Sequence, residues 1–312
     1  GDPMPDFAAL QQELRRLAAE RDAVILAHNY QRPEVQDAAD HTGDSLELSR
    51  IAAKDPHRVI LFCGVHFMAE TAYILSPEKT VLMPDKRAGC PMADMVTVAG
   101  LRKLKAEHPD AVVVAYVNTS ADIKAETDVC CTSSNAVQIV ERFPKGQKII
   151  FVPDRNLGDY VARQTGREET MILWQGWCHV HDDFRAAEIE RIRAANPGSV
   201  LMAHPESRRE VLEIADVVTS TSGMLRYPQS SKAGTFIVAT ETGLLYKLGQ
   251  LYPDRRFIPA SAQAICPNMK RNTLEKAIAT LGDEWDDVLE HEVVVPEPIR
   301  VKALRSVERM LA

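Results

Sequence analysis

The sequence predicts an α/β protein built from three similar three-layer α/β/α units with parallel sheets. Two observations lead to this prediction. Short runs rich in Val, Ile and Leu alternate with amphipathic helical patterns along nearly all of the 312 residues. Residues able to carry chemistry also recur every 88 positions. A fixed period of this length indicates one supersecondary unit used three times, and equivalent points on three copies can converge at a central axis.

Nine apolar runs are the expected strands, three in each copy. They are apolar almost throughout rather than alternating, which is typical of parallel strands covered on both faces. The runs are 23–27, 58–63 and 80–83, then 111–116, 148–152 and 170–173, then 199–203, 235–239 and 256–258. Helical patterns over 6–20, 93–107 and 182–195 lead into the copies at the same phase. Parallel strands joined by helical crossovers imply α/β layers.

These elements divide the chain into units 1–92, 93–180 and 181–281, with a C-terminal tail over 282–312. The strand pattern of the third unit ends near residue 268, and a helical pattern over 272–281 completes it. The tail holds a strand-like run over 291–295 and a helix from Glu297 onward. Because the tail has no fourth strand set, we expect it to pack back on the first unit.

Composition indicates a soluble globular protein with a large core. Apolar residues make up 45% and charged residues 26% of the chain, and the formal net charge is −7. This acidic balance argues against general binding to nucleic acid or to acidic membranes. No apolar run approaches the length of a membrane span, and the N-terminus shows no secretory signal pattern. Six cysteines in so long a chain form no dense disulfide framework, so we expect a reducing, cytoplasmic environment.

Three cysteines keep the 88-residue period: Cys90, Cys178 and Cys266. Each follows an expected strand at the point where it gives way to a loop, which is where α/β proteins place their sites. Three converging thiolates would hold a metal centre and leave one coordination position open. A closed structural zinc site would need a fourth protein ligand, which the repeat does not supply. A [4Fe–4S] cluster held by three cysteines instead leaves one iron free to act as a Lewis acid.

The alternative is that these cysteines are small buried core residues, the commonest role of a free cysteine. The other three cysteines serve as an internal comparison, because Cys63, Cys130 and Cys131 have no cysteine at the equivalent positions of the other copies. We assign those three no metal role.

A second set with the same period consists of the hydroxyl residues Ser45, Ser133 and Thr221. Each precedes a helical pattern, so each could be an ordinary N-cap. Helix N-termini also bind phosphate and carboxylate groups. Each hydroxyl lies 17 positions after a polar strand end. This shared phase favours three anion-binding sites around one cavity.

The polar strand ends form the third set. Histidine or tyrosine stands at the period, and a second polar residue follows two positions later: His28 and Tyr30, Tyr116 and Asn118, His204 and Glu206. Imidazole, phenol and carboxylate groups brought together can move protons and bind carboxylates. A structural hydrogen bond is the ordinary role of a single histidine, but the shared phase favours function. His181, three residues after Cys178, could support the metal ligand or contact a substrate.

These residues resemble the quinolinate synthase family, which makes the pyridine ring in de novo NAD biosynthesis. The resemblance covers residues 23–270 in the correct order. It runs through Ala27-His-Asn-Tyr30, Gly43-Asp-Ser45, Gly89-Cys-Pro-Met-Ala-Asp94, Tyr116-Val-Asn-Thr119, Gly176-Trp-Cys-His-Val-His181, His204-Pro-Glu206, Ser220-Thr221-Ser222 and Cys266-Pro-Asn-Met-Lys270. Some family members carry a further cysteine pair before the last cluster ligand, whereas this chain reads Ser261-Ala-Gln-Ala-Ile-Cys266.

The resemblance implies three α/β units around a pseudo-threefold axis, each giving one cysteine to an oxygen-sensitive [4Fe–4S] cluster. It implies condensation of iminoaspartate with dihydroxyacetone phosphate to quinolinate, with release of phosphate and two waters. An aspartate oxidase or aspartate dehydrogenase would supply the iminoaspartate. Tyr30, His204 and Glu206 are then the expected proton-transfer residues. The expected substrate-binding residues are His28, Ser45, Tyr116, Asn118, Ser133, His181, His204, Glu206 and Thr221.

Two other functions are compatible with an open iron site. One is a [4Fe–4S] hydro-lyase acting on a small hydroxy acid, which would need no phosphate site. The other is a non-enzymatic iron–sulfur sensor of a phosphorylated metabolite. Sensors usually signal through nucleic acid or a partner domain, and this acidic chain shows neither a basic recognition helix nor an appended module.

Overall fold

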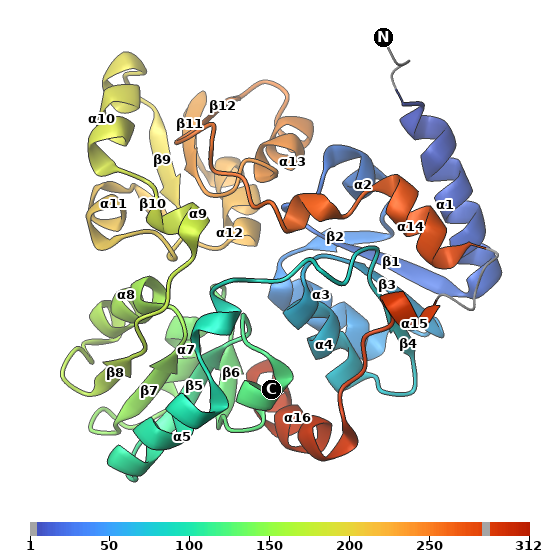
Figure 1. The fold of residues 1–312 in the computed structure, drawn as a ribbon. Helices are drawn as coiled ribbons and strands as arrows, with labels where there is room; N and C mark the ends of the chain where they lie inside the picture. The colour runs from blue at the N-terminus through green and yellow to red at the C-terminus, as the bar shows by residue number, and fades with distance from the viewer. Residues whose placement is uncertain (1–4, 283–287) are drawn as a thin grey trace. The chain divides into compact units, whose positions relative to one another are not determined.

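The computed structural model describes residues 5–282 and 288–312, which form three four-stranded sheets of one topology (Figure 1). The strand orders are β2-β1-β3-β4, β6-β5-β7-β8 and β10-β9-β11-β12, and neighbouring strands pair in parallel. The strands are β1 Ala23–His28, β2 His41–Gly43, β3 Val59–Cys63, β4 Thr80–Leu82, β5 Val112–Tyr116, β6 Val129–Cys131, β7 Ile149–Val152, β8 Met171–Leu173, β9 Val200–Ala203, β10 Val217–Val218, β11 Thr235–Ala239 and β12 Arg256–Pro259. The predicted fold class is confirmed.

All nine predicted strands are present, and the three that the sequence pattern missed are β2, β6 and β10. Each is a sheet edge of two or three residues, which is too short to show a period. The first unit carries helices α1 Phe7–Arg21, α2 Pro33–Ala38, α3 Ser45–Lys54, α4 His66–Leu75, α14 Leu274–Leu281 and α15 Val288–His291. The remaining helices are α5 Val98–Glu107, α6 Ala121–Lys124, α7 Ala136–Glu141, α8 Arg155–Thr165, α9 His179–Asp182, α10 Ala186–Ala195, α11 Arg209–Ile214, α12 Thr221–Arg226, α13 Leu244–Leu251 and α16 Glu297–Leu311.

The chain divides into two compact units. The first comprises residues 1–90 and 267–296 and holds the β1–β4 sheet. The second comprises residues 91–266 and 297–312 and holds the other two sheets. Cys90 therefore belongs to the first unit, and Cys178 and Cys266 belong to the second.

A short aspartate side chain sets the register of the edge strand in every sheet. Asp40, Asp128 and Asp216 are 88 residues apart and each stands just before the edge strand. The carboxylate accepts the N–H of a residue in the central strand, at 2.7–2.8 Å. The main-chain N–H of the same aspartate donates to the carbonyl of that central-strand residue. Because the side chain and the main chain of one residue are both used, the edge strand cannot slip along its neighbour.

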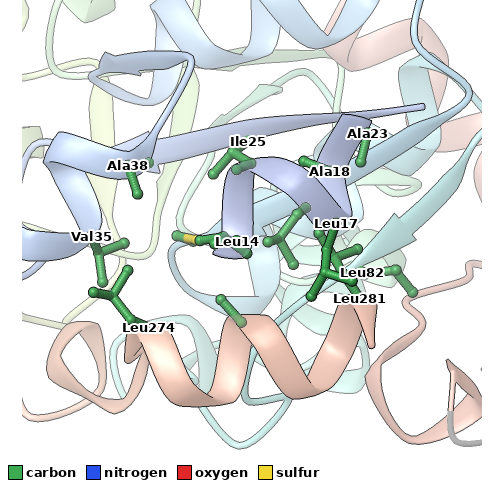
Figure 2. Close-up of a cluster of buried hydrophobic side chains, with 14 of the residues drawn as sticks. Leu14, Leu17, Ala18, Ala23, Ile25, Val35, Ala38, Leu82, Leu274 and Leu281 are labelled. Atoms are coloured by element: carbon green, nitrogen blue, oxygen red, sulfur yellow. The ribbon is translucent and has the colours of Figure 1, made fainter. Parts of the chain in front are cut away.

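The C-terminal segments pack differently from the division expected above. Helix α14, which we grouped with the third unit, packs on α1 in the first unit. Its Leu274 and Leu281 enter the core cluster of Leu14, Leu17 and Ile25 (Figure 2). A helix packs wherever its apolar stripe finds a complementary face, and the order of segments along the sequence does not identify that face.

The tail after residue 287 is shared between the two units. Glu292 forms an antiparallel bridge with Leu82, which extends the β4 edge of the first unit. Helix α16, which we expected on the first unit, instead packs on β6 and α6 in the second. There Ser306 donates to the carbonyl of Lys124 at 2.9 Å. The fully buried Ala303 and Val307 lie on the same helix.

We predict that Leu274→Ala destabilises the protein by about 2–5 kcal/mol. The reason is that Leu274, on α14, is almost fully buried in the core cluster that α14 shares with α1. Urea unfolding followed by circular dichroism measures the loss. Leu251→Ala is the control, since Leu251 is 49% exposed and its truncation should change stability by no more than about 0.5 kcal/mol. Equal effects of the two substitutions would contradict this packing of α14.

Candidate functional site

In all three sheets the predicted acid–base residues follow the strand at which the chain reverses direction across the sheet. After β1, β5 and β9 the chain first adds an edge strand on one side (β2, β6 or β10). It then crosses over to add the next strand on the other side; we call this strand (β3, β7 or β11) the crossover strand. The carboxyl ends beside such a reversal are where open α/β sheets bind ligands. His28 ends β1 and Tyr30 follows it, Tyr116 ends β5, and His204 and Glu206 follow β9; all five side chains are buried.

A buried amide or amine holds the loop after the strand in two of the three copies. Gln36 Nε2 donates to the carbonyls of Asn29 and Gln31. Lys124, 88 residues later and fully buried, donates from Nζ to the carbonyls at positions 117 and 119. These two side chains therefore hold the loops that carry Tyr30 and Asn118. Sequence reasoning missed both, because the spacing matches the period but the residue types differ.

The tautomers of the two strand-end histidines follow from the backbone. The N–H of Tyr30 donates to Nδ1 of His28 at 3.1 Å, and the N–H of Glu206 donates to Nδ1 of His204 at 3.2 Å. An amide N–H can only donate, so each Nδ1 must present its lone pair. The ring proton is then on Nε2, and each histidine can donate one hydrogen bond to an anionic ligand.

Four of the predicted site residues form one buried group in the second unit. Glu206 accepts a hydrogen bond from the Tyr116 hydroxyl at Oε1, and its Oε2 lies 3.1 Å from Nδ1 of His181. The rings of His181 and His204 lie 4.5 Å apart, centroid to centroid. The side chains of His181 and Glu206 are 3% and 6% exposed, so this contact is shielded from bulk water.

This environment keeps Glu206 ionised. Burial raises the pKa of its carboxyl group, but the electrostatic influence of the His181 and His204 imidazoles and hydrogen bonds from His181 and Tyr116 outweigh burial. The pKa of Glu206 therefore lies below its usual range.

His181 joins this acid–base group to a predicted metal ligand. Its Nδ1 lies 3.2 Å from Sγ of Cys178, and its Nε2 lies 2.8 Å from the Thr240 hydroxyl. The ligand atoms of Cys178, His181 and Glu206 lie within 4.8 Å of one another, close enough to hold a metal ion. His181 is thus placed to support Cys178 and to hold Glu206.

Neighbouring residues complete this group, and the period does not reveal them. Asn156 Nδ2 donates to Asp182 at 2.9 Å and to the carbonyl of Glu206 at 3.1 Å. Asp154 is fully buried, and its Oδ1 accepts the amides of residues 156 and 157. In the described part of the chain, Asp154 Oδ2 has no hydrogen-bond partner. Burial raises the pKa of Asp154 well above its usual value, and the Glu206 charge raises it further.

The three cysteine loops are held by the same main-chain hydrogen bond. In each copy, an amide just after the crossover strand donates to the carbonyl two residues before the cysteine, at 2.8–2.9 Å. The pairs are His66 with Ala88, Arg155 with Gly176, and Thr242 with Ala264. The bond sets the point at which each cysteine leaves the sheet.

Gly176 is required by this arrangement. Its N–H donates to the carbonyl of Pro153 at 2.9 Å. A Cβ at position 176 would lie only 2.4 Å from that oxygen, so a larger residue would push the Cys178 loop away.

Exposure separates the periodic cysteines from the others. Cys90, Cys178 and Cys266 are partly exposed, whereas Cys63, Cys130 and Cys131 are fully buried. Burial raises the pKa of Cys63 to about 12 and also raises the pKa values of Cys130 and Cys131. Because thiolates rather than thiols bind metals, the three periodic cysteines are the donor set that fits a cluster.

Neighbouring residues make the helix caps that Ser45 and Thr221 could have made. Asp44 caps α3 by accepting the amide of Glu47, and Ser220 caps α12 by accepting that of Gly223. Ser133 lies two residues before Asn135, the N-cap position of α7. The ordinary capping explanation therefore does not account for the three periodic hydroxyls. Helices α7 and α12 have only six residues each, so the hydroxyl groups rather than strong helix dipoles would have to bind anions there.

The structure brings together part of the predicted site. Cys178 and Cys266 pack against one apolar cluster, which includes Val180 and Ala264. Asn118, Ser133 and Thr221 lie in the same compact unit. Cys90, His28, Tyr30 and Ser45 belong to the first unit, and their convergence with the second set stays a prediction.

Comparison with known proteins places this site in a family. Residues 12–312 match the family model described as quinolinate synthetase A protein. The chain is 52% identical over 303 residues to the quinolinate synthase of Desulforudis audaxviator, covering 97% of this chain and 98% of that one. It is also 52% identical to the Geobacter metallireducens quinolinate synthase, covering 97% of each. The Methanoregula boonei quinolinate synthase is 49% identical over 309 residues, covering 99% of this chain and all of that one.

The family suggested by the sequence motifs is thus confirmed. The family-model match over residues 12–312 extends across both compact units. The chain belongs to the quinolinate synthetase A family, whose members are enzymes of NAD biosynthesis.

Proposed function

We propose that this enzyme condenses iminoaspartate with dihydroxyacetone phosphate to form quinolinate, releasing phosphate and two waters. The observation that carries the proposal is the buried group of Glu206, Tyr116, His181 and His204, which lies beside Cys178 in one compact unit. An ionised carboxylate, a phenol and imidazoles next to a metal ligand are the groups that proton transfer during condensation and dehydration requires. The overall reaction balances without an external oxidant.

We propose Cys90, Cys178 and Cys266 as the ligands of a [4Fe–4S] cluster. When bound, such a cluster supplies a Lewis-acid iron that can polarise a substrate oxygen and favour loss of hydroxyl. The three thiols fit this role because they are partly exposed and leave the sheets through the same hydrogen-bonded turn. An oxygen-sensitive centre of this kind suits the reducing cytoplasm that we propose as its location.

Glu206 is our candidate general base. Its depressed pKa keeps it ionised, and Tyr116 and His181 hold its two oxygens. His204 donates from Nε2, which suits a substrate carboxylate or a developing oxyanion. Tyr30, in the loop after β1, is our candidate for a second proton transfer.

The substrates carry two carboxylates and one phosphate in all. We propose that His28, Asn118 and the periodic hydroxyls of Ser45, Ser133 and Thr221 bind these anions. The hydroxyls favour this role because the caps of α3 and α12 are made by other residues. The supplier of the unstable imine would be an oxidase or dehydrogenase acting on aspartate.

Of the two alternatives, the hydro-lyase remains open to a direct test. It would dehydrate a hydroxy acid without releasing phosphate. An anaerobic assay with iminoaspartate and dihydroxyacetone phosphate should show phosphate release together with the ultraviolet absorption of a new pyridine. The sensor is not supported, because the family consists of enzymes.

Among the described residues, no helix combines the length and apolar character needed to cross a membrane.

We predict that Cys90→Ser, Cys178→Ser and Cys266→Ser each abolish cluster binding, because each removes one of three thiolate ligands. Anaerobic reconstitution followed by an iron assay measures the loss. Cys63→Ser is the control and should keep the wild-type iron content, since Cys63 is fully buried in the core. Normal iron content in Cys178→Ser would refute the ligand assignment.

We predict that Tyr30→Phe retains the cluster but loses quinolinate formation by about a hundredfold or more, as expected when one proton-transfer group is removed. The ring remains, so its edge-on contact with His28, at 4.6 Å between centroids, is preserved. Iron content and visible absorption should match the wild type. Wild-type turnover in this variant would remove Tyr30 from the mechanism.

We predict a pH-dependent gain in stability from Asp154→Asn. The folded state holds the Asp154 proton more tightly than the unfolded chain, because its pKa is raised. Wild-type stability therefore declines as pH rises above the unfolded pKa of about 4. The amide variant lacks this decline, so its advantage in thermal unfolding should grow from pH 5.5 to pH 8.5. Glu210→Gln, at an exposed carboxylate, is the control, and parallel curves for wild type and Asp154→Asn would contradict the raised pKa.

A further inference from the structure

Two adjacent residues at the end of β11 bind both cysteine loops of the second unit. The Thr240 hydroxyl lies 2.8 Å from Nε2 of His181, the residue whose Nδ1 contacts Cys178. Glu241 Oε2 accepts the main-chain N–H of Cys266 at 2.9 Å. One strand end thus holds the Cys178 loop through an imidazole and the Cys266 loop through its backbone.

The carboxylate of Glu241 is built into this position. It is 1% exposed, and its second oxygen, Oε1, accepts the N–H of Gly243. Both oxygens therefore accept main-chain amides, one on the strand-to-helix turn and one on the cysteine itself. A buried carboxylate held in this way cannot rotate freely, so it fixes the backbone of Cys266 relative to the end of β11.

The equivalent positions of the other sheets do not use a carboxylate for this purpose. Cys63, Val152 and Ala239 occupy equivalent positions, because their strand partners Ala27, Ala115 and Ala203 are 88 residues apart. Glu241, two residues after Ala239, therefore corresponds to Val65 and Asp154. Asp154 instead accepts amides at the start of its own helix, α8. Of these three equivalent positions, the one occupied by Glu241 is the one that binds a cysteine amide.

We propose that Thr240 and Glu241 are positioning residues for the iron–sulfur centre. They hold the Cys178 and Cys266 loops at the separation that the cluster needs, so that less loop ordering remains when the cluster binds. Glu241 also places a carboxylate beside the backbone of a cluster ligand. A nearby anion disfavours the more negative, reduced cluster, so Glu241 favours the oxidised state that acts as a Lewis acid. This role rests on the proposed assignment of Cys178 and Cys266 as ligands.

The test compares wild type, Glu241→Gln, Thr240→Val and the exposed control Glu210→Gln, all reconstituted anaerobically as the 312-residue chain. Three quantities are measured: iron per chain, the rate of iron release to a chelator, and the reduction potential from spectroscopic titration. The amide in Glu241→Gln can accept only one of the two N–H groups, and it carries no charge. We expect iron release about tenfold faster than in wild type, together with a higher reduction potential. Thr240→Val should also release iron faster, with a smaller change in potential, because no charge is removed.

Glu210→Gln, at an exposed carboxylate on α11, should match the wild type in release rate and potential. Wild-type release from Thr240→Val, or a wild-type potential in Glu241→Gln, would overturn the proposal even if Glu241→Gln lowered stability, because a purely structural role would not move the potential. A wild-type protein that takes up no iron would overturn the proposed function, whereas an iron-loaded wild type with unaltered variants would overturn only this role.

Discussion

The arrangement of the site depends on one main-chain hydrogen bond that occurs in all three α/β copies. It joins an amide just after the crossover strand to the carbonyl two residues before each periodic cysteine. Main-chain groups carry no side-chain identity, so this bond can recur while the sequence around it changes. It holds residues 88, 176 and 264 at the sheet edge, where the thiols remain partly exposed. Without it the cysteines would lie on unrestrained loops, and ordering them would cost conformational entropy when a cluster binds.

Electrostatics within the second unit separates the pKa values of two buried carboxyl groups. Glu206 is surrounded by imidazoles and a phenol, which hold its pKa below the usual range. Asp154 is fully buried and feels the Glu206 charge, so its pKa is raised. Two buried carboxylates near one another cannot both ionise cheaply. The pKa values of the two carboxyl groups are therefore shifted in opposite directions from their usual values.

The fold class, nine strands and the family could be predicted from the sequence, because an 88-residue period and long apolar runs leave a strong signal. The packing of α14 on α1 could not, since several faces could accept its apolar stripe. The edge strands were too short to show a pattern. At the site, His181 was suspected from its spacing to Cys178, but Lys124 and Glu241 were not. Their roles come from hydrogen bonds to main-chain atoms, which no residue pattern encodes.

The three copies show how one backbone supports different chemistry. The main-chain hydrogen bond before each cysteine, the edge-strand aspartates and the cysteines repeat in all three copies. The side chains that hold the neighbouring loops differ between the copies. Where the first copy holds its strand-end loop with Gln36, the second uses Lys124. Where the second copy keeps Asp154 within its own helix start, the third extends Glu241 to Cys266. A fixed scaffold thus allows each copy to contribute a sulfur through the same turn while only one supplies the carboxylate beside it. The differences between the copies around the three cysteines then come from side chains alone.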